Sequence, residues 1–128
     1  MTNKKISVLA IEDDKFILSA YKTAFENEGF EVHLAQSAKD ALKQLKAVTP
    51  DIIILDLLMP KDDGFSVLTK LQKNKKWSQI PVLIASNLDD EKYIEKAKAL
   101  GVGEYVVKSN ISLVDLINRI KEIRNEIV

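Results

Sequence analysis

The stretch that decides the fold runs from Asp51 to Pro60 and reads Asp-Ile-Ile-Ile-Leu-Asp-Leu-Leu-Met-Pro. Its apolar run at 52–55, rich in β-branched residues, predicts a strand that is buried on both faces. Asp56 follows this strand, and Pro60 turns the chain away because proline has no N–H with which to continue a ladder. In an open α/β sheet, an acid at the carboxyl end of a central strand lies where ligands bind. The same aspartate also suits the simpler role of starting a turn.

Composition indicates one globular domain, which we expect to span residues 1–128. The chain is 46% hydrophobic and 30% charged, which is ordinary for a domain with its own core. Nineteen basic residues balance 19 acidic ones, so no net charge draws the chain to nucleic acid or to a membrane surface. The chain has no cysteine and no apolar run of about 20 residues, which excludes disulfides and predicts no membrane span. We expect a cytoplasmic protein, and Met1 with a full last helix favours a native single domain.

Strand and helix patterns alternate five times along the chain. Strands are predicted at 6–11, 31–35, 51–55, 81–85 and 104–107. Helical spacing of apolar residues follows each strand, with predicted starts at Ser37, Asp89 and Ser112 and predicted ends at Gly29 and Gly101. This alternation predicts a parallel sheet with helices on both faces. We expect an α/β, flavodoxin-like, doubly wound sheet of five parallel strands in the order 2-1-3-4-5, with five helices.

Polar residues follow four of the predicted strands. Glu12 and Asp13 follow the first strand, Asp56 the third, Ser86 the fourth and Lys108 the fifth. The expected order brings these ends to one edge of the sheet, with the first and third strands about 4.8 Å apart. At a separation of about 4 Å, each pair of carboxylates repels by on the order of 4 kcal/mol. A hard divalent cation offsets this repulsion, and oxygen ligands without His or Cys suit Mg²⁺.

A carboxylate beside a bound cation indicates chemistry at that carboxylate. Aspartate can act as a nucleophile that forms an aspartyl phosphate, and it needs no general base because it is already ionised. A phosphoryl group on Asp56 would be neutralised by Mg²⁺, by the Lys108 ammonium and by the Ser86 hydroxyl. Taken singly, Lys108 also suits a solvated lysine and Ser86 a helix cap. Their convergence at neighbouring strand ends favours a functional site.

Four motifs resemble the receiver domain of two-component response regulators, in order and in spacing. They are Ile11-Glu12-Asp13-Asp14, Asp56-Leu57-Leu58-Met59-Pro60 with Gly64, Ala85-Ser86, and Tyr105-Val106-Val107-Lys108. The resemblance covers nearly the whole chain and implies a CheY-like fold. It implies that Asp56 accepts a phosphoryl group from a phosphohistidine on a sensor histidine kinase or a phosphotransfer protein. By the same resemblance Asp13 would bind Mg²⁺ directly, Glu12 would bind it through water, and the Leu58 carbonyl would complete the protein ligands.

The resemblance also makes Ser86 and Tyr105 switch residues. Ser86 would move toward the phosphoryl group and leave space into which Tyr105 turns, so that a local charge biases a two-state element. The surface of the fourth helix, the fifth strand and the last helix would then change, and an unidentified downstream protein would bind there. No DNA-binding module is expected within the chain. We expect a monomer or a weak homodimer, because Glu104, Asp115 and Arg119 match charged positions that some receiver dimers use.

Two positions depart from the receiver pattern. Asn87 follows Ser86 where the family usually has a very small residue, and we expect it to narrow access to Asp56. Ser109 follows Lys108 where the family usually has proline, often with a cis bond. A cis bond before a residue other than proline costs about 3 kcal/mol, which favours a trans peptide here.

These departures keep other interpretations open. The first interpretation is a stand-alone, phosphorylatable receiver that catalyses only its own phosphorylation and dephosphorylation. The second is a receiver-like interaction module that binds partners without phosphorylation. The third is a magnesium-dependent phosphatase with an aspartyl nucleophile, but Leu58 stands where such enzymes have their acid, two residues after the nucleophile.

Overall fold

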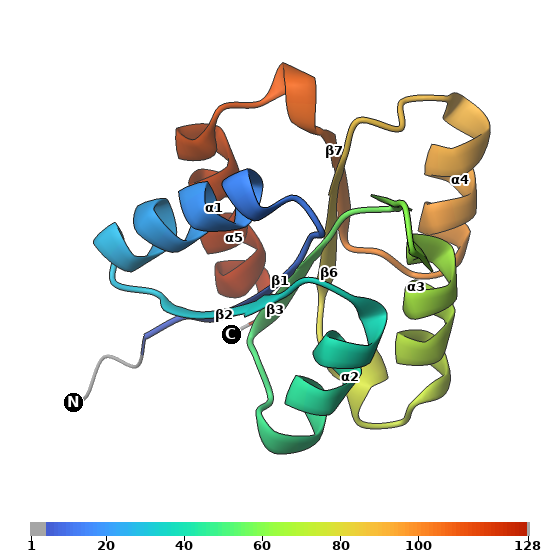
Figure 1. Cartoon of the computed structure of the whole chain (residues 1–128), viewed down its shortest axis with the longest axis horizontal. Coiled ribbons are helices and arrows are strands. Elements are labelled where there is room, and N and C mark those ends of the chain that lie inside the picture. The colour runs from blue at the N-terminus through green and yellow to red at the C-terminus, as the bar shows by residue number, and fades with distance from the viewer. Residues whose placement is uncertain (1–4, 128) are drawn as a thin grey trace.

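A five-stranded parallel sheet forms the centre of the computed structural model, which describes residues 5–127 (Figure 1). Its strands are β1 (Ser7–Ile11), β2 (Glu31–Ala35), β3 (Ile52–Leu55), β6 (Val82–Ser86) and β7 (Glu104–Val107). They lie in the order β2-β1-β3-β6-β7, and each neighbouring pair is parallel. Because β6 and β7 are the fourth and fifth strands of this sheet, the predicted order 2-1-3-4-5 is confirmed.

Five α-helices cover the two faces of the sheet. They are α1 (Lys15–Asn27), α2 (Ala38–Ala47), α3 (Gly64–Lys73), α4 (Glu91–Ala99) and α5 (Leu113–Ile127). Helices α1 and α5 pack on one face, and α2, α3 and α4 pack on the other (Figure 1). The flavodoxin-like, doubly wound fold expected from the sequence is therefore confirmed. Within residues 5–127, no helix combines the length and the apolar character that a bilayer crossing requires.

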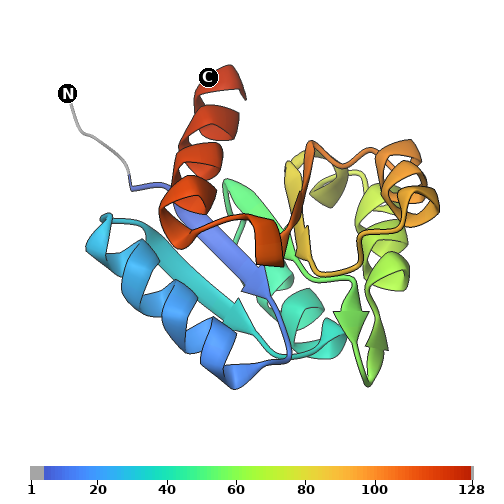
Figure 2. The same ribbon diagram turned by 90° about the horizontal axis from the view of Figure 1, so that it is seen from above.

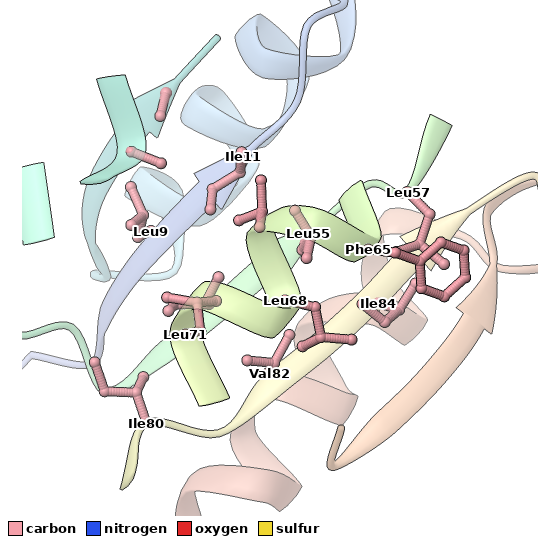
Figure 3. Packing of buried hydrophobic residues seen from close by; sticks show 14 of the residues in the cluster. Leu9, Ile11, Leu55, Leu57, Phe65, Leu68, Leu71, Ile80, Val82 and Ile84 are labelled. Carbon is pink, nitrogen blue, oxygen red and sulfur yellow. The ribbon is translucent and has the colours of Figure 1, made fainter. Parts of the chain in front are cut away.

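The central strand β3 is buried on both faces, which explains its continuous apolar sequence. Residues Ile52 to Leu55 are at most 1% exposed. On one side of the sheet, Leu68 and Leu71 of α3 pack in the same cluster as Leu55 of β3, as Figure 3 shows. Full burial of one such side chain contributes about 1.5–3 kcal/mol. The carboxyl end of β3, which carries Asp56, is therefore rigidly placed.

Four of the five helix ends that the sequence predicted are confirmed. The hydroxyls of Ser37 and Ser112 each accept the backbone N–H three residues further on, at 3.1 Å. Gly29 and Gly101 adopt φ angles of 83° and 89° after α1 and α4. These left-handed angles favour glycine because a Cβ would be strained there.

The start of α4 was predicted wrongly. Asp90, not Asp89, is the N-cap, and its carboxylate accepts the Lys92 N–H at 3.1 Å. Both aspartates have the side chain that a cap requires, so residue type alone does not choose between them. Which of the two aspartates caps α4 depends on the path of the β6–α4 loop.

The sequence patterns also missed a small hairpin that follows β3. Strands β4 (Leu58–Met59) and β5 (Asp62–Asp63) pair antiparallel. Figure 2 shows this hairpin apart from the main sheet, beside the start of α3. Asp62 accepts the Ala38 N–H of α2 at 3.0 Å, and Asp63 accepts the Phe65 N–H of α3 at 2.9 Å. The two aspartates therefore anchor the loop after Asp56 to two helices.

Candidate functional site

Three carboxylates meet at the carboxyl ends of β1 and β3. Glu12 and Asp13 follow β1, Asp56 follows β3, and one oxygen from each lies within 4.8 Å of the other two. The strand register explains this, because Ile11 pairs with Leu55 and the Asp56 N–H donates to the Ile11 carbonyl at 3.1 Å. Glu12 is 2% exposed and Asp56 is 4% exposed, while Asp13 is half-buried. The structure thus brings together the three acids that the sequence placed at one edge of the sheet.

Lys108 is the counter-ion of this cluster. Its Nζ lies 2.7 Å from Glu12 Oε2 and 2.9 Å from Asp56 Oδ2. Burial raises the pKa of the Glu12 carboxyl to about 7, even though the hydrogen bond from Lys108 acts to lower it. Burial also acts to lower the pKa of Lys108, but its hydrogen bonds to Glu12 and Asp56 outweigh burial and raise this pKa. The ammonium therefore stays charged and bridges the two acids, a double pairing that the sequence did not predict.

The donor set fits a magnesium ion. Glu12, Asp13 and Asp56 offer only oxygen atoms, and these three carboxylates carry more charge than the Lys108 ammonium that contacts two of them can balance. Mg²⁺ prefers such oxygen ligands and commonly binds through one or two carboxylates while it keeps several waters. Leu58 lies two residues after Asp56, and its N–H donates to Asp56 Oδ1 at 2.9 Å. The predicted use of its carbonyl as a ligand stays a prediction.

Ser86 and Tyr105 both form hydrogen bonds with the loop between β6 and α4. Ser86 is fully buried at the end of β6, and its Oγ accepts the Leu88 N–H at 3.3 Å. Tyr105 is half-buried, and its hydroxyl donates to the Leu88 carbonyl. Leu88 thus connects the two predicted switch residues through its backbone. Residue type could not reveal this role, because any residue supplies the same N–H and carbonyl.

The two departures from the receiver pattern contact each other. Asn87 Oδ1 accepts the Ser109 N–H at 2.9 Å. The side chain that was expected to narrow access to Asp56 is therefore engaged with the β7–α5 loop. The Lys108–Ser109 peptide is trans, as the sequence favoured, and residues 5–127 contain no cis peptide.

The charged residues considered for a dimer are partly paired within the chain. Arg119 forms ion pairs with Glu104 of β7 and with Glu122 of α5. Asp115 is exposed at the start of α5. Two of the three candidate charges thus already face each other in one chain, and the weak homodimer stays a prediction.

Fold and site together define a class of protein, a doubly wound α/β domain with a buried acid cluster and a lysine at its strand ends. The family model described as the response regulator receiver domain matches residues 8–121. The chain therefore belongs to the response regulator receiver domain family. Receiver domains interact with histidine kinases or phosphotransfer partners.

Known relatives match most of this chain. The transcriptional regulatory protein AfsQ1 of Streptomyces coelicolor is 33% identical over 102 residues, which are 80% of this chain and 44% of AfsQ1. The receiver domain of the Francisella response regulator 1452 is 31% identical, with a TM-score of 0.87 over 97% of this chain and 100% of that one. A CheY-like receiver of Methanospirillum hungatei, 24% identical, has a TM-score of 0.88 over 96% of both chains and shows the shared fold. The chain spans less than half the length of the curated relatives that it matches.

Proposed function

We propose that this chain is a stand-alone receiver that accepts a phosphoryl group on Asp56 in a Mg²⁺-dependent reaction. The observation that carries the proposal is the cluster of Glu12, Asp13 and Asp56, in which Lys108 bridges the two buried acids Glu12 and Asp56. An Asp56 oxygen forms a bond to phosphorus while the bond between phosphorus and the donor histidine nitrogen breaks. The electron pair stays on that nitrogen, which takes a proton from solvent. The chain catalyses only its own phosphorylation and dephosphorylation, and a cytoplasmic location is part of the same proposal.

The surrounding residues have separate roles in this reaction. Asp13, Glu12 through water, and the Leu58 carbonyl would hold Mg²⁺, which when bound supplies charge to neutralise the phosphoryl oxygens. Lys108 moves its ammonium from the two carboxylates to a phosphoryl oxygen, a short shift because it already contacts Asp56 at 2.9 Å. Ser86 exchanges its acceptor role toward Leu88 for donation to another phosphoryl oxygen.

Movement of Ser86 would carry the signal to the surface. Its Oγ accepts from Leu88, and Tyr105 donates to the carbonyl of the same Leu88. A change at Ser86 therefore reaches Tyr105 through one residue. The surface of α4, β7 and α5 changes with Tyr105, and an unidentified downstream protein binds there.

The proposal is tested by incubating the chain with Mg²⁺ and acetyl phosphate and measuring its intact mass. We expect the mass to rise by one phosphoryl group, and we expect no adduct to form when a chelator has removed Mg²⁺ before the donor is added. Absence of the adduct at saturating donor would favour the phosphorylation-independent interaction module instead. Steady release of phosphate from an added phosphomonoester would favour the phosphatase interpretation.

Replacing Lys108 with methionine is expected to tighten Mg²⁺ binding by roughly tenfold. The ammonium lies between Glu12 and Asp56 and repels a second cation, and unit charges about 4 Å apart interact by about 1 kcal/mol even in water. Methionine keeps a chain of similar length without the charge. Titration calorimetry checks this, with Lys43→Met on the exposed side of α2 as the matched control. Unchanged or weaker binding in Lys108→Met would show that Lys108 does not compete with the ion.

Exposed apolar side chains near the carboxyl ends of the strands supply a docking surface for the phosphodonor protein. Phe16 at the start of α1 is 88% exposed, and Leu113 and Val114 at the start of α5 are also exposed. Helices α1 and α5 both begin where a sheet strand has just ended, so these residues lie on the side of the sheet edge that carries Asp56. Contiguous exposed apolar patches mark interaction sites, and the starts of the two helices adjoin each other because Ile17 and Leu113 line one cavity.

Replacing Phe16 with alanine is expected to slow transfer from a phosphorylated histidine protein by roughly tenfold, as for a central aromatic contact. Transfer from acetyl phosphate should stay unchanged, because Phe16 is outside the acid cluster. Rates with both donors are compared with those of Thr23→Ala, an exposed substitution on the same helix. Equal slowing with both donors would mean that Phe16 affects the pocket itself rather than docking.

A further inference from the structure

Two loops leave adjacent strands side by side next to the acid cluster. Ser86, the last residue of β6, is in register with Val107, the last residue of β7. Asn87 and Lys108 are therefore the first residues of the two loops. The Asn87 carboxamide crosses between them and accepts the Ser109 N–H at 2.9 Å. This single bond links the loop after Ser86 to the loop after Lys108.

The bond depends on the residue types at both positions, 87 and 109. A proline at position 109 would have no N–H to donate, and a very small residue at position 87 would have no acceptor that reaches across. The N–H that Ser109 retains is paired by the side chain that Asn87 supplies. The two departures from the receiver pattern thus form one structural unit rather than two separate defects.

Beyond the strand pairing that ends at Val107, the other described restraints on the backbone of the Lys108 loop are weak. The 3₁₀ helix η2 (Lys108–Asn110) has no side-chain cap, and its closing bond from the Ile111 N–H to the Lys108 carbonyl is long, at 3.4 Å. A cavity of about 330 Å³ borders this loop and is lined in part by Tyr21, Asn87 and Lys108. The hydrogen bond from the Ser109 N–H to Asn87 is therefore a further restraint on this backbone.

We propose that Asn87 is a positioning residue that holds the Lys108 loop against the end of β6 and so sets the reach of the Lys108 ammonium to Asp56. Lys108 is then fixed at two points, through its side chain by Glu12 and Asp56 and through the next N–H by Asn87. The consequence for phosphorylation rests on the proposed function. The structural consequence, a well-placed ammonium, does not depend on it.

The test is a set of four proteins: the wild-type chain, Asn87→Ala, Lys108→Met and the double variant. Phosphorylation rates are measured with acetyl phosphate at saturating Mg²⁺. We expect Asn87→Ala to lower the rate roughly three- to tenfold, the range that corresponds to one neutral hydrogen bond. In the Lys108→Met background the same substitution should change nothing, because Asn87 acts through Lys108. Asn110→Ala, an exposed asparagine in the same loop, is the matched control and should behave as the wild-type chain.

A second measurement needs no phosphate donor. In ¹⁵N spectra the Lys108 ammonium signal should exchange slowly with solvent in the wild-type chain, because its bonds to Glu12 and Asp56 are largely buried. Asn87→Ala should speed this exchange and that of the Ser109 amide, and Asn110→Ala should affect neither.

The outcomes separate the two proposals. Faster Lys108 exchange in Asn87→Ala supports the positioning role even if the wild-type chain takes no phosphate, a result that would overturn only the proposed function. Normal phosphorylation of the wild-type chain, with rate and exchange unchanged in Asn87→Ala, overturns the positioning role. Equal slowing by Asn87→Ala with and without Lys108 also overturns it, because Asn87 would then act on Asp56 by another route.

Discussion

Replacing Asp56 with asparagine is expected to abolish the phosphoryl adduct on this chain completely. The amide nitrogen and oxygen of asparagine are far weaker nucleophiles than an ionised carboxylate. The other acids of the cluster do not replace Asp56, because Asp56 alone follows the central strand β3 while Glu12 and Asp13 follow β1. Intact mass after incubation with acetyl phosphate and Mg²⁺ measures the effect.

The folded structure should survive this substitution. Asparagine has nearly the same size, and its Oδ1 can still accept the Leu58 N–H as Asp56 does at 2.9 Å. The variant loses the charge that pairs with Lys108, but it also removes repulsion from Glu12 and Asp13. A normal circular dichroism spectrum with no adduct would therefore localise the effect to the chemistry.

The matched control is the same substitution at the other end of the β3 segment. Asp51 accepts the Ser7 N–H through Oδ2 at 2.8 Å, and asparagine can keep that bond. Asp51→Asn should therefore be phosphorylated as the wild-type chain is. An adduct that persists in Asp56→Asn would place the phosphoryl group on another residue and would contradict the proposed reaction.

Replacing Gly64 with alanine is expected to destabilise the fold by about 3 kcal/mol, the upper part of the usual range for overpacking. A Cβ at this position would lie 2.4 Å from the Leu57 Cα and 2.8 Å from the Asp56 carbonyl oxygen. Both contacts are with backbone, which cannot turn aside as a flexible side chain can. The start of α3 therefore approaches the chain after Asp56 so closely that only glycine fits.

The same clash should also disturb the site. Leu57 packs in one buried cluster with Phe65, the residue after Gly64, and Figure 3 shows both side chains close to Ile84 of β6. Gly64→Ala should push the chain at Asp56 and Leu57 outward. The rate of phosphorylation should then fall together with the free energy of unfolding. Urea unfolding gives the free energy of unfolding, and acetyl phosphate gives the rate.

Gly103 supplies the control for this experiment. A Cβ there would meet only the Val82 carbonyl oxygen at 3.6 Å, an ordinary contact. Gly103→Ala should therefore change the free energy of unfolding by less than about 1 kcal/mol. Equal effects of the two substitutions would show that the close approach at Gly64 relaxes without cost.

The positions of the candidate site residues followed from their places at strand ends. Asp56 was predicted at the sheet edge because the apolar run before it has to be a buried strand, and the carboxyl ends of parallel strands meet at one edge. Two other features, the N-cap of α4 and the β4–β5 hairpin, were missed for different reasons. Asp89 and Asp90 both suit a helix cap, and only the loop path selected Asp90. The β4–β5 hairpin is two residues long on each side, too short to produce a periodic pattern.

The order of strands, the two helical layers and the gathering of acids at one edge are thus present in the amino-acid pattern. They depend on local periodicity and on the handedness of strand connections, which act within a few dozen residues. The partners of individual side chains depend on the tertiary structure. Lys108 bridges Glu12 and Asp56 across 96 and 52 residues, and Asn87 meets Ser109 across 22. Such pairs form only after strand register has brought distant backbones together, so their distances are consequences of the packed sheet.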